Sequence, residues 1–248
     1  IAVGRIELYS SAKDIAQHKY DFLGLGRKLI ADPELPNKCA AGLAQTIRPC
    51  IYCYICVSQI FINKPLICAV NTDVGREYKA DLIASTAETR QRFVVVGGGP
   101  GGMEAARLLA SVGHQVTLFE KEPQLGGTAR IAALAYEPNG GLIDYLSGEL
   151  RRLNVDVRLN SAVTIDALQS LQPDHVIVAT GAKREAPDIP GENLHHVFDG
   201  EEMRGLLLGG DDRGLKKLHP IKRALVALSQ AVGLTRNISW VRMLSHLW

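Results

Sequence analysis

The sequence has 248 residues, 46% of them hydrophobic, and a formal net charge of +2. This length suits one large domain or two small ones with a buried core, and the small net charge gives no general attraction to nucleic acid or to anionic membranes. No apolar run approaches the roughly 20 residues of a membrane-spanning helix, and the first residues lack the layout of a signal peptide.

Cysteine usage is the most unusual feature of the composition. Five cysteines are present, and four of them lie in one short stretch. Small secreted proteins instead spread cysteines over the whole domain as a disulfide framework. We therefore expect a cytoplasmic protein in which the clustered cysteines serve another purpose.

The first part of the chain contains two similar apolar runs. Residues 1–6 form the first, residues 22–33 contain the second, and a helix is predicted between them from Ser11 to about Tyr20. Each run leads into a glycine-arginine pair, namely Gly4 with Arg5 and Gly26 with Arg27. In (β/α)8 barrels the loops after the last two strands commonly form a phosphate site, and arginine can bind a phosphate through two hydrogen bonds. Two such turns in another kind of α/β protein are the alternative interpretation.

The clustered cysteines follow with the spacing C-x2-C-x2-C-x11-C, and they are Cys50, Cys53, Cys56 and Cys68. Thiolates suit iron–sulfur clusters or zinc, and three close cysteines with a fourth farther along the chain can enclose a cubane cluster. Structural zinc more often uses two separated C-x2-C pairs or Cys/His pairs, and no histidine lies within this stretch. The spacing therefore favours an iron–sulfur cluster over zinc and over ordinary core cysteines.

Apolar residues of the same stretch are expected to form a shell around the metal centre, because such a shell limits water access and tunes the reduction potential. The residues of this expected shell are Ile51, Ile55, Val57, Ile60, Phe61 and Ile62. Cys39 lies outside the motif, and we expect a buried, inert thiol there. Residues 69–91 are mixed and polar, so we expect a connector.

A second motif, VVVGGGPGGMEAA, begins at Val94. Its apolar start is typical of a strand buried on both faces. A helix is predicted from Met103 to Val112, with Met103, Ala106, Leu109 and Ala110 facing the sheet and Gly113 as its C-cap. The glycines of the G-x-G-x-x-G pattern are Gly97, Gly99 and Gly102, and the next predicted strand ends at Glu120. A carboxylate at that point can reach a ribose hydroxyl, so strand, glycines, helix, strand and acid together predict a dinucleotide site.

The motif leaves open whether the nucleotide is NAD or FAD, because both contain ADP-ribose. A second glycine pair at Gly126 and Gly127, an amphipathic helix at Leu142–Leu153 and an apolar strand at 174–182 are expected to complete the α/β sheet. Residues 201–248 are rich in Lys and Arg, which favours a solvated basic helix or an inter-domain linker over a nucleic-acid or membrane contact.

Taken together, these stretches resemble the middle of the NADH:flavin oxidoreductases of the 2,4-dienoyl-CoA reductase, 2-enoate reductase and trimethylamine dehydrogenase type. The matching stretches include GLGRKLIADPELPNK, IRPCIYCYIC, VVVGGGPGGMEAARLLASVGHQVTLFEK and VIVATGA, and they span roughly residues 1–200. In that family an FMN-bearing barrel is followed by an iron–sulfur cluster, an FAD domain and an NAD(P)H domain.

The resemblance implies an α/β protein with four parts along the chain. These are the C-terminal end of an FMN-binding (β/α)8 (TIM) barrel at 1–49, an iron–sulfur segment with a linker at 50–91, a partial Rossmann-like FAD-binding domain at 92–205 and a basic helical linker at 206–248. It also implies that the rest of the barrel, with the substrate acid and base, precedes residue 1. The NAD(P)H domain is expected after residue 248.

The resemblance also assigns individual residues. Gly26 and Arg27 match the FMN phosphate pair, with Gly4 and Arg5 at the preceding strand end, and Cys50, Cys53, Cys56 and Cys68 match the [4Fe-4S] ligands. The FAD diphosphate and ribose positions are matched by Gly97, Gly99, Gly101, Gly102 and Glu120. Thr128 falls where many members have glutamine, and Val163 falls near the adenine end.

The implied activity is a relay in which NAD(P)H reduces FAD, the cluster carries electrons to FMN, and FMN reduces an activated C=C bond of an enoate, a dienoyl-CoA or an enone. The substrate is a small molecule that binds in the barrel, and neither nucleic acid nor membrane is an expected partner. An amine dehydrogenase of the trimethylamine dehydrogenase type, with electrons passing outward, is one alternative. A non-catalytic FAD-binding remnant with a structural zinc site is another.

Overall fold

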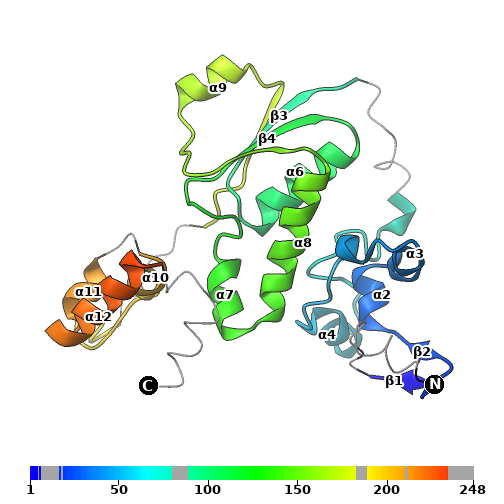
Figure 1. Cartoon of the computed structure of the whole chain (residues 1–248), viewed down its shortest axis with the longest axis horizontal. Coiled ribbons are helices and arrows are strands. Elements are labelled where there is room, and N and C mark those ends of the chain that lie inside the picture. The colour runs from blue at the N-terminus through cyan, green and yellow to red at the C-terminus, as the bar shows by residue number, and fades with distance from the viewer. Residues whose placement is uncertain are drawn as a thin grey trace.

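The computed structural model of the chain describes residues 1–4, 6, 17, 19–79, 89–182, 189–209 and 212–233. Within these ranges the elements form three groups in chain order, which lie side by side in Figure 1. A central parallel sheet with its helices lies between an N-terminal group and a C-terminal group of short helices. The predicted α/β class is therefore confirmed.

The central sheet has four strands in the order β5-β4-β3-β6, and every pairing is parallel. The strands are β3 (Arg92–Val96), β4 (Gln115–Phe119), β5 (Asp156–Arg158) and β6 (His175–Val178). In the central strand Val94 and Val95 are buried, as expected for a strand covered on both faces. Strand order reverses beside β3, and ligands of such sheets bind at the carboxyl ends of the strands near this point.

Helix α6 (Pro100–Ser111) begins directly after the glycine loop that follows β3. Gly99 is its N-cap and Pro100 stands at its first position, where proline already has the backbone angle that a helix requires. The helix ends before Gly113, whose φ of 101° lies in the left-handed region that favours glycine. The predicted helix, its buried residues Met103 and Ala106 and its terminating glycine are confirmed.

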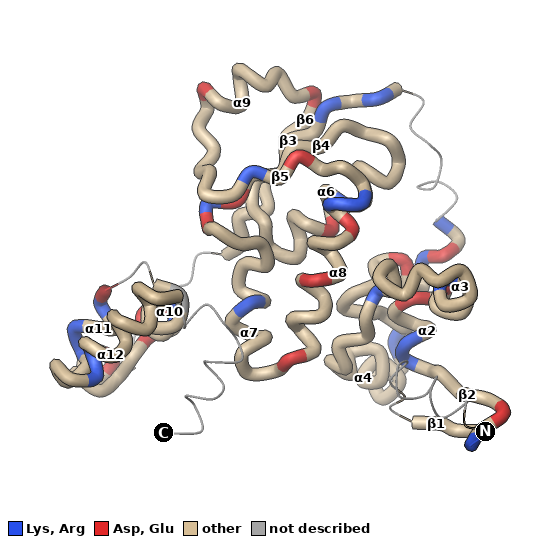
Figure 2. The backbone as a smooth tube through the Cα atoms, in the orientation of Figure 1, with Lys and Arg blue, Asp and Glu red and all other residues tan. Residues whose placement is uncertain are grey.

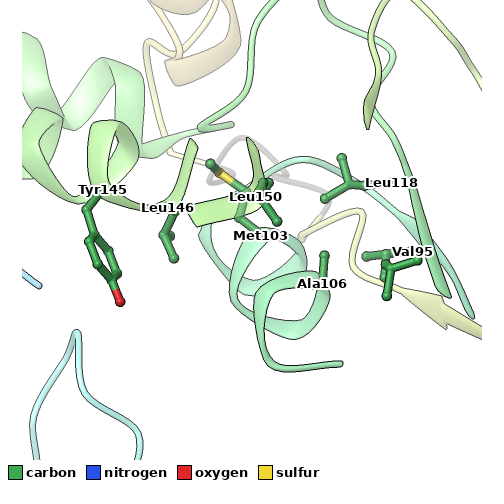
Figure 3. Close-up of a cluster of buried hydrophobic side chains, with 8 residues drawn as sticks. Val95, Met103, Ala106, Leu118, Tyr145, Leu146 and Leu150 are labelled. Atoms are coloured by element: carbon green, nitrogen blue, oxygen red, sulfur yellow. The ribbon is translucent and has the colours of Figure 1, made fainter. Parts of the chain in front are cut away.

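The core lies between the sheet and the pair α6 and α8 (Pro138–Arg152), as Figure 3 shows. Its buried residues are Val95, Met103, Ala106, Val116, Leu118, Tyr145, Leu146 and Leu150. The apolar stripe predicted at Leu142–Leu153 lies on α8 and supplies part of this core. Two shorter helices, α7 (Ala129–Ala135) and α9 (Ile165–Leu171), complete the central group.

The N-terminal group contains two parallel two-residue strands, β1 (Ala2–Val3) and β2 (Leu23–Gly24). Parallel neighbours are expected for consecutive strands of a barrel, since a crossover must connect them. The helices and turns of this group are α2 (Arg27–Ala31), α3 (Leu35–Ala40), η1 (Ala44–Thr46), α4 (Ile55–Phe61) and η2 (Glu77–Lys79). The helix predicted between the strands falls largely outside the described residues.

The C-terminal group consists of α10 (Gly200–Leu208), α11 (Arg213–Lys217) and α12 (Pro220–Ala231). A capping box between Asp199 and Glu202 begins α10. The helical character predicted for the tail is confirmed as far as residue 233, and Figure 2 shows basic residues along α11 and α12. Residues 234–248 lie outside the described ranges. No helix in the described part of the chain is long and apolar enough to span a membrane.

Two burial predictions for the N-terminal group are wrong. Cys39 is exposed although it lies four residues after the buried Leu35 on the same face of α3, because the described elements cover only the first turn of this short helix. Four residues of the predicted shell are exposed as well, and they are Ile55, Ile60, Phe61 and Ile62. Helix α4 buries Cys56, and the described elements leave its other faces uncovered.

Candidate dinucleotide and cysteine sites

The glycine-rich stretch that joins β3 to the first turn of α6 passes very close to its neighbours at two glycines. A Cβ atom at Gly97 would overlap the carbonyl oxygen of Ala179, and one at Gly102 would overlap the carbonyl oxygen of Gly97. Around Gly99 and Gly101, in contrast, a Cβ atom would meet nothing within 4 Å. Gly97 and Gly102 therefore allow tight backbone packing, whereas Gly99 and Gly101 border open space at the carboxyl edge of the sheet.

The first turn of α6 has free backbone donors beside this open space. No described residue accepts a hydrogen bond from the N–H of Gly101 or of Gly102, because the first N–H groups of a helix lack intrahelical acceptors. Unpaired N–H groups and the positive end of the helix dipole favour an anion such as a diphosphate. This turn can therefore hold the diphosphate of a dinucleotide.

Glu120 stands at the end of β4, next to the same loop. It is buried, and its carboxylate accepts hydrogen bonds from Gly98 N (2.7 Å) and Glu122 N (2.9 Å). These two bonds fix the carboxylate at the carboxyl edge of the sheet. A carboxylate in this place can also accept a hydrogen bond from a ribose hydroxyl.

Two more predicted residues come close to this edge. Gly126 N donates to Gly98 O (2.7 Å), which brings the turn before Thr128 against the glycine loop. Thr128 is exposed as the N-cap of α7. Ser161 N donates to Glu120 O (2.9 Å), so Val163 follows closely after the strand end and is half-buried.

The cysteine segment has a mixed environment. Cys56 is buried, Cys50 and Cys68 are half-buried, and Cys53 is exposed. Burial raises the pKa of the Cys50 thiol and the nearby Cys68 and Cys56 raise it further, while the positive charge of Arg27 opposes the rise. Among the described residues, no group of three or more His, Cys, Asp or Glu side chains is assembled for a metal ion. The structure thus places Cys56 and Cys68 within electrostatic reach of Cys50 without forming a complete ligand set, and metal sites often form only on binding.

Arg27 contacts the cysteine segment directly. Its guanidinium carbon lies 4.4 Å from the ring centre of Tyr54 and 5.2 Å from that of Tyr52, within the range of a cation–π contact. A hydrogen bond with Tyr54 raises the pKa of Arg27. Both tyrosines have positive φ angles (51° and 61°), which is uncommon outside glycine.

One hydrogen-bond donor of the Arg27 guanidinium has no partner among the described residues. This donor is the Nη1 atom, which is shielded from solvent. A Cβ atom at the adjacent Gly26 would meet nothing within 4 Å. An unpaired buried donor beside open backbone fits an anionic group such as a phosphate. Gly4 has a φ of 132° and open space around it as well, and Arg5 lies outside the described residues.

Sequence reasoning missed a buried arginine between these two sites. Arg48 lies just before the cysteine segment and lines a cleft of about 570 Å³ between the N-terminal group and the helices α6 and α8. Other residues that line this cleft include Asp32, Asn71, Arg107 and Tyr145. The available signal was an arginine within IRPC, two residues before the first metal-type cysteine.

The central group matches a known domain family. A family described as NAD(P)-binding Rossmann-like domain matches residues 95–148, which include the glycine loop, α6, β4 and much of α8. This match confirms a dinucleotide-type fold. It leaves the choice between NAD(P) and FAD open, because a Rossmann-like unit of this kind binds the ADP part that both molecules share.

Longer similarities extend over most of the chain. Bilirubin reductase of Mediterraneibacter gnavus is 40% identical over 203 residues, which cover 80% of this chain and 31% of that protein. NADH oxidase of Thermoanaerobacter brockii is 44% identical over 207 residues, which cover 80% of this chain and 31% of that protein. The chain belongs to the NADH:flavin oxidoreductase family. It spans less than a third of the length of these two oxidoreductases.

Solved structures of this family superpose on the chain. A 2-naphthoyl-CoA reductase in complex with 2-naphthoyl-CoA has a TM-score of 0.71 at 32% identity, covering 75% of this chain and 29% of that one. The 6-hydroxypseudooxynicotine amine oxidase of Pseudomonas geniculata has a TM-score of 0.73 at 34% identity, covering 81% of this chain and 32% of that one. Family membership therefore rests on fold as well as on sequence.

Proposed function

We propose that the chain is the central part of an oxidoreductase in which NAD(P)H reduces FAD, a [4Fe-4S] cluster carries electrons onward to FMN, and an activated C=C bond is reduced. The observation that carries this proposal is the position of Arg27. It begins α2 with an unpaired buried donor and packs on two tyrosines of the cysteine segment. An anion-binding turn and a metal-type loop are thereby in direct contact, as a relay between a flavin and a cluster requires.

For FAD, the N-terminal turn of α6 would bind the diphosphate and Glu120 would bind a ribose hydroxyl. The glycines of this turn and of the loop before it are Gly97, Gly99, Gly101 and Gly102, and Thr128 and Val163 would border the cofactor farther along. A bound flavin can take up a hydride and release the two electrons one at a time. The contribution of the chain is to fix the diphosphate and the ribose at the carboxyl edge of the sheet.

For the cluster, the proposed ligands are Cys50, Cys53, Cys56 and Cys68, whose spacing and soft donors fit four iron-bound thiolates. For FMN, Gly26 and Arg27 would hold the phosphate, with Gly4 and Arg5 at the neighbouring strand end. A cubane cluster carries single electrons. The chain holds its loop against α2 through the contacts of Arg27 with Tyr52 and Tyr54.

Metal content tests the proposal. Anaerobic reconstitution with iron and sulfide should give about four Fe per chain. Cys53→Ser should lower that number, because it removes one of the four proposed ligands. Cys53 is exposed, so it can ligate a cluster only if the loop closes on it. Cys39→Ser is the matched control, since it removes an exposed thiol outside the motif. Tightly bound zinc without iron would contradict the proposal and favour the zinc-containing remnant.

The direction of electron flow has a second candidate. The matched proteins include an amine oxidase as well as reductases by name, so oxidation of an amine with electrons passing outward is the alternative. The full-length protein should be assayed with an enone and NADH and, separately, with an amine and an artificial acceptor. Turnover with the amine alone would overturn the reductase proposal and leave the cofactor assignment intact.

A further inference from the structure

Arg48 is held at the start of the cysteine segment, two residues before Cys50. Its side chain is buried, and its backbone N–H donates to Asp32 Oδ2 at 2.8 Å. Asp32 follows the last residue of α2, and its Oδ2 atom also accepts a hydrogen bond from Lys38 Nζ at 2.7 Å. The entry to the segment is therefore fixed to the end of α2.

The guanidinium of Arg48 reaches the other end of the same segment. Its Nη1 donates to Asn71 Oδ1 at 2.8 Å, and Asn71 stands three residues after Cys68. Asn71 Nδ2 donates in turn to Ile30 O at 2.9 Å. One buried side chain thus joins the residues that precede the first cysteine to those that follow the last one.

The opposite side of the guanidinium faces the dinucleotide domain. Arg48 Nη2 lies 3.6 Å from Glu104 Oε1 of α6, and the guanidinium carbon lies 5.7 Å from the ring centre of Tyr145 of α8. Tyr145 stands at the opposite end of the buried cluster from Val95 in Figure 3. Glu104 also accepts two hydrogen bonds from Arg107, at 2.8 and 2.9 Å, so its carboxylate is oriented within α6.

We propose that Arg48 is a positioning residue that couples the cysteine segment to α6 and so fixes the distance between the cluster and the FAD site. The proposal rests on the proposed function for the identity of the two centres. A guanidinium is suited to this task because its planar fork reaches several acceptors in fixed directions. Two of them, Asn71 and Glu104, belong to different parts of the chain.

The charge of Arg48 gives a second consequence. Arg48 stands two residues before Cys50, and a cation near an iron–sulfur cluster stabilises the reduced, more negative state, so this charge is expected to raise the reduction potential, to an extent reduced by the paired carboxylate of Glu104. Loss of the charge should lower the midpoint potential, and replacement by lysine should preserve it. A side chain that only filled space would leave the potential unchanged.

The test compares Arg48→Gln and Arg48→Lys with Arg152→Gln in the full chain. Arg152 forms an ion pair with Glu149 inside α8, at 2.8 Å, and serves as the matched control. In the metal-free chain, R48Q should raise amide exchange about tenfold in the residues on both sides of the cysteine segment, as expected for loss of a charged hydrogen bond. R48K should raise exchange on at least one side, because an ammonium cannot reproduce the fork.

The second measurement is the midpoint potential of the cluster in the reconstituted chain. R48Q should lower the midpoint potential of the cluster, and R48K and R152Q should leave it unchanged. Exchange in R48Q equal to that in R152Q would overturn the coupling. A reconstituted chain that holds zinc and no iron would overturn the proposed function, while the metal-free exchange experiment would still decide the role of Arg48.

Discussion

Four glycines between the end of β3 and the first turn of α6 have two different surroundings. Gly97 and Gly102 are packed against backbone atoms, whereas Gly99 and Gly101 face open space. The G-x-G-x-x-G pattern alone does not separate these roles. The structure separates them because it shows what a side chain would meet at each position, and the two groups should respond differently to substitution.

Gly102→Ala should cost about 1–3 kcal/mol of unfolding free energy, because the added methyl group would meet the carbonyl of Gly97 and force the backbone apart. Gly101→Ala should leave the unfolding free energy unchanged or raise it by about 0.5–1 kcal/mol, because alanine is more favourable than glycine inside a helix. The same change should weaken FAD binding at least about tenfold, since the methyl group would occupy the proposed diphosphate space. Urea unfolding and a fluorescence titration with FAD measure the two effects. Unchanged FAD affinity in G101A would contradict the placement of the diphosphate.

Residue roles that depend on neighbours in sequence were predictable, and those that depend on distant partners were not. The glycine loop and Glu120 follow one another within a single strand–helix–strand unit. Arg48 has partners 23 and 56 residues away, so its place in IRPC marks it as a residue near the first cysteine but does not reveal its burial. Cys39 was mispredicted for the same reason, because its exposure depends on which elements cover α3.

Helices α6 and α8 form the element that supports the dinucleotide site. Their apolar residues recur with helical periodicity, which is why the sequence predicted the buried faces of both. The edge of α8 that faces the cleft is polar, and there Glu149 is buried next to Arg152. Periodicity shows that such an edge exists and says nothing about which charges pair across it.

Glu149 gives α8 a dependence on pH. Burial acts to raise the pKa of this carboxyl group, but hydrogen bonds from Arg152 and the charge of Arg107 outweigh burial and hold the pKa below its usual value. The unfolded chain therefore binds this proton more readily, so the stabilisation is present above about pH 4.5 and is lost as the pH falls below it.

Glu149→Gln should make unfolding free energy less dependent on pH between about pH 6 and pH 3 than it is in the wild-type chain. Urea unfolding across this range measures the effect. Asp156→Asn is the control, because the ion pair of Asp156 with Arg158 is exposed and contributes little. Equal pH dependence in E149Q and the wild-type chain would show that Glu149 is not the group responsible.

The part of the molecule that the structure describes has one extensive core and two smaller groups beside it (Figure 1). The core belongs to the central sheet and its two main helices, whereas β1 and β2 are two residues long. The sequence indicated this order of parts through the spacing of its motifs. It could not indicate how unequally they are packed, because that depends on which surfaces the elements cover.

This unequal packing predicts unequal stability within one chain. Ile1, Val3 and Phe22 remain largely exposed beside the short strands, and a two-stranded sheet is at best marginally stable in water. Amides of β2 and α2 should therefore exchange at least about a hundredfold faster than those of β3 and β4, since their opening requires only local unfolding. Hydrogen exchange followed by NMR on the 248-residue chain measures both sets in one sample. Equal protection of β2 and β3 would show that the N-terminal group unfolds together with the central sheet as a single cooperative unit.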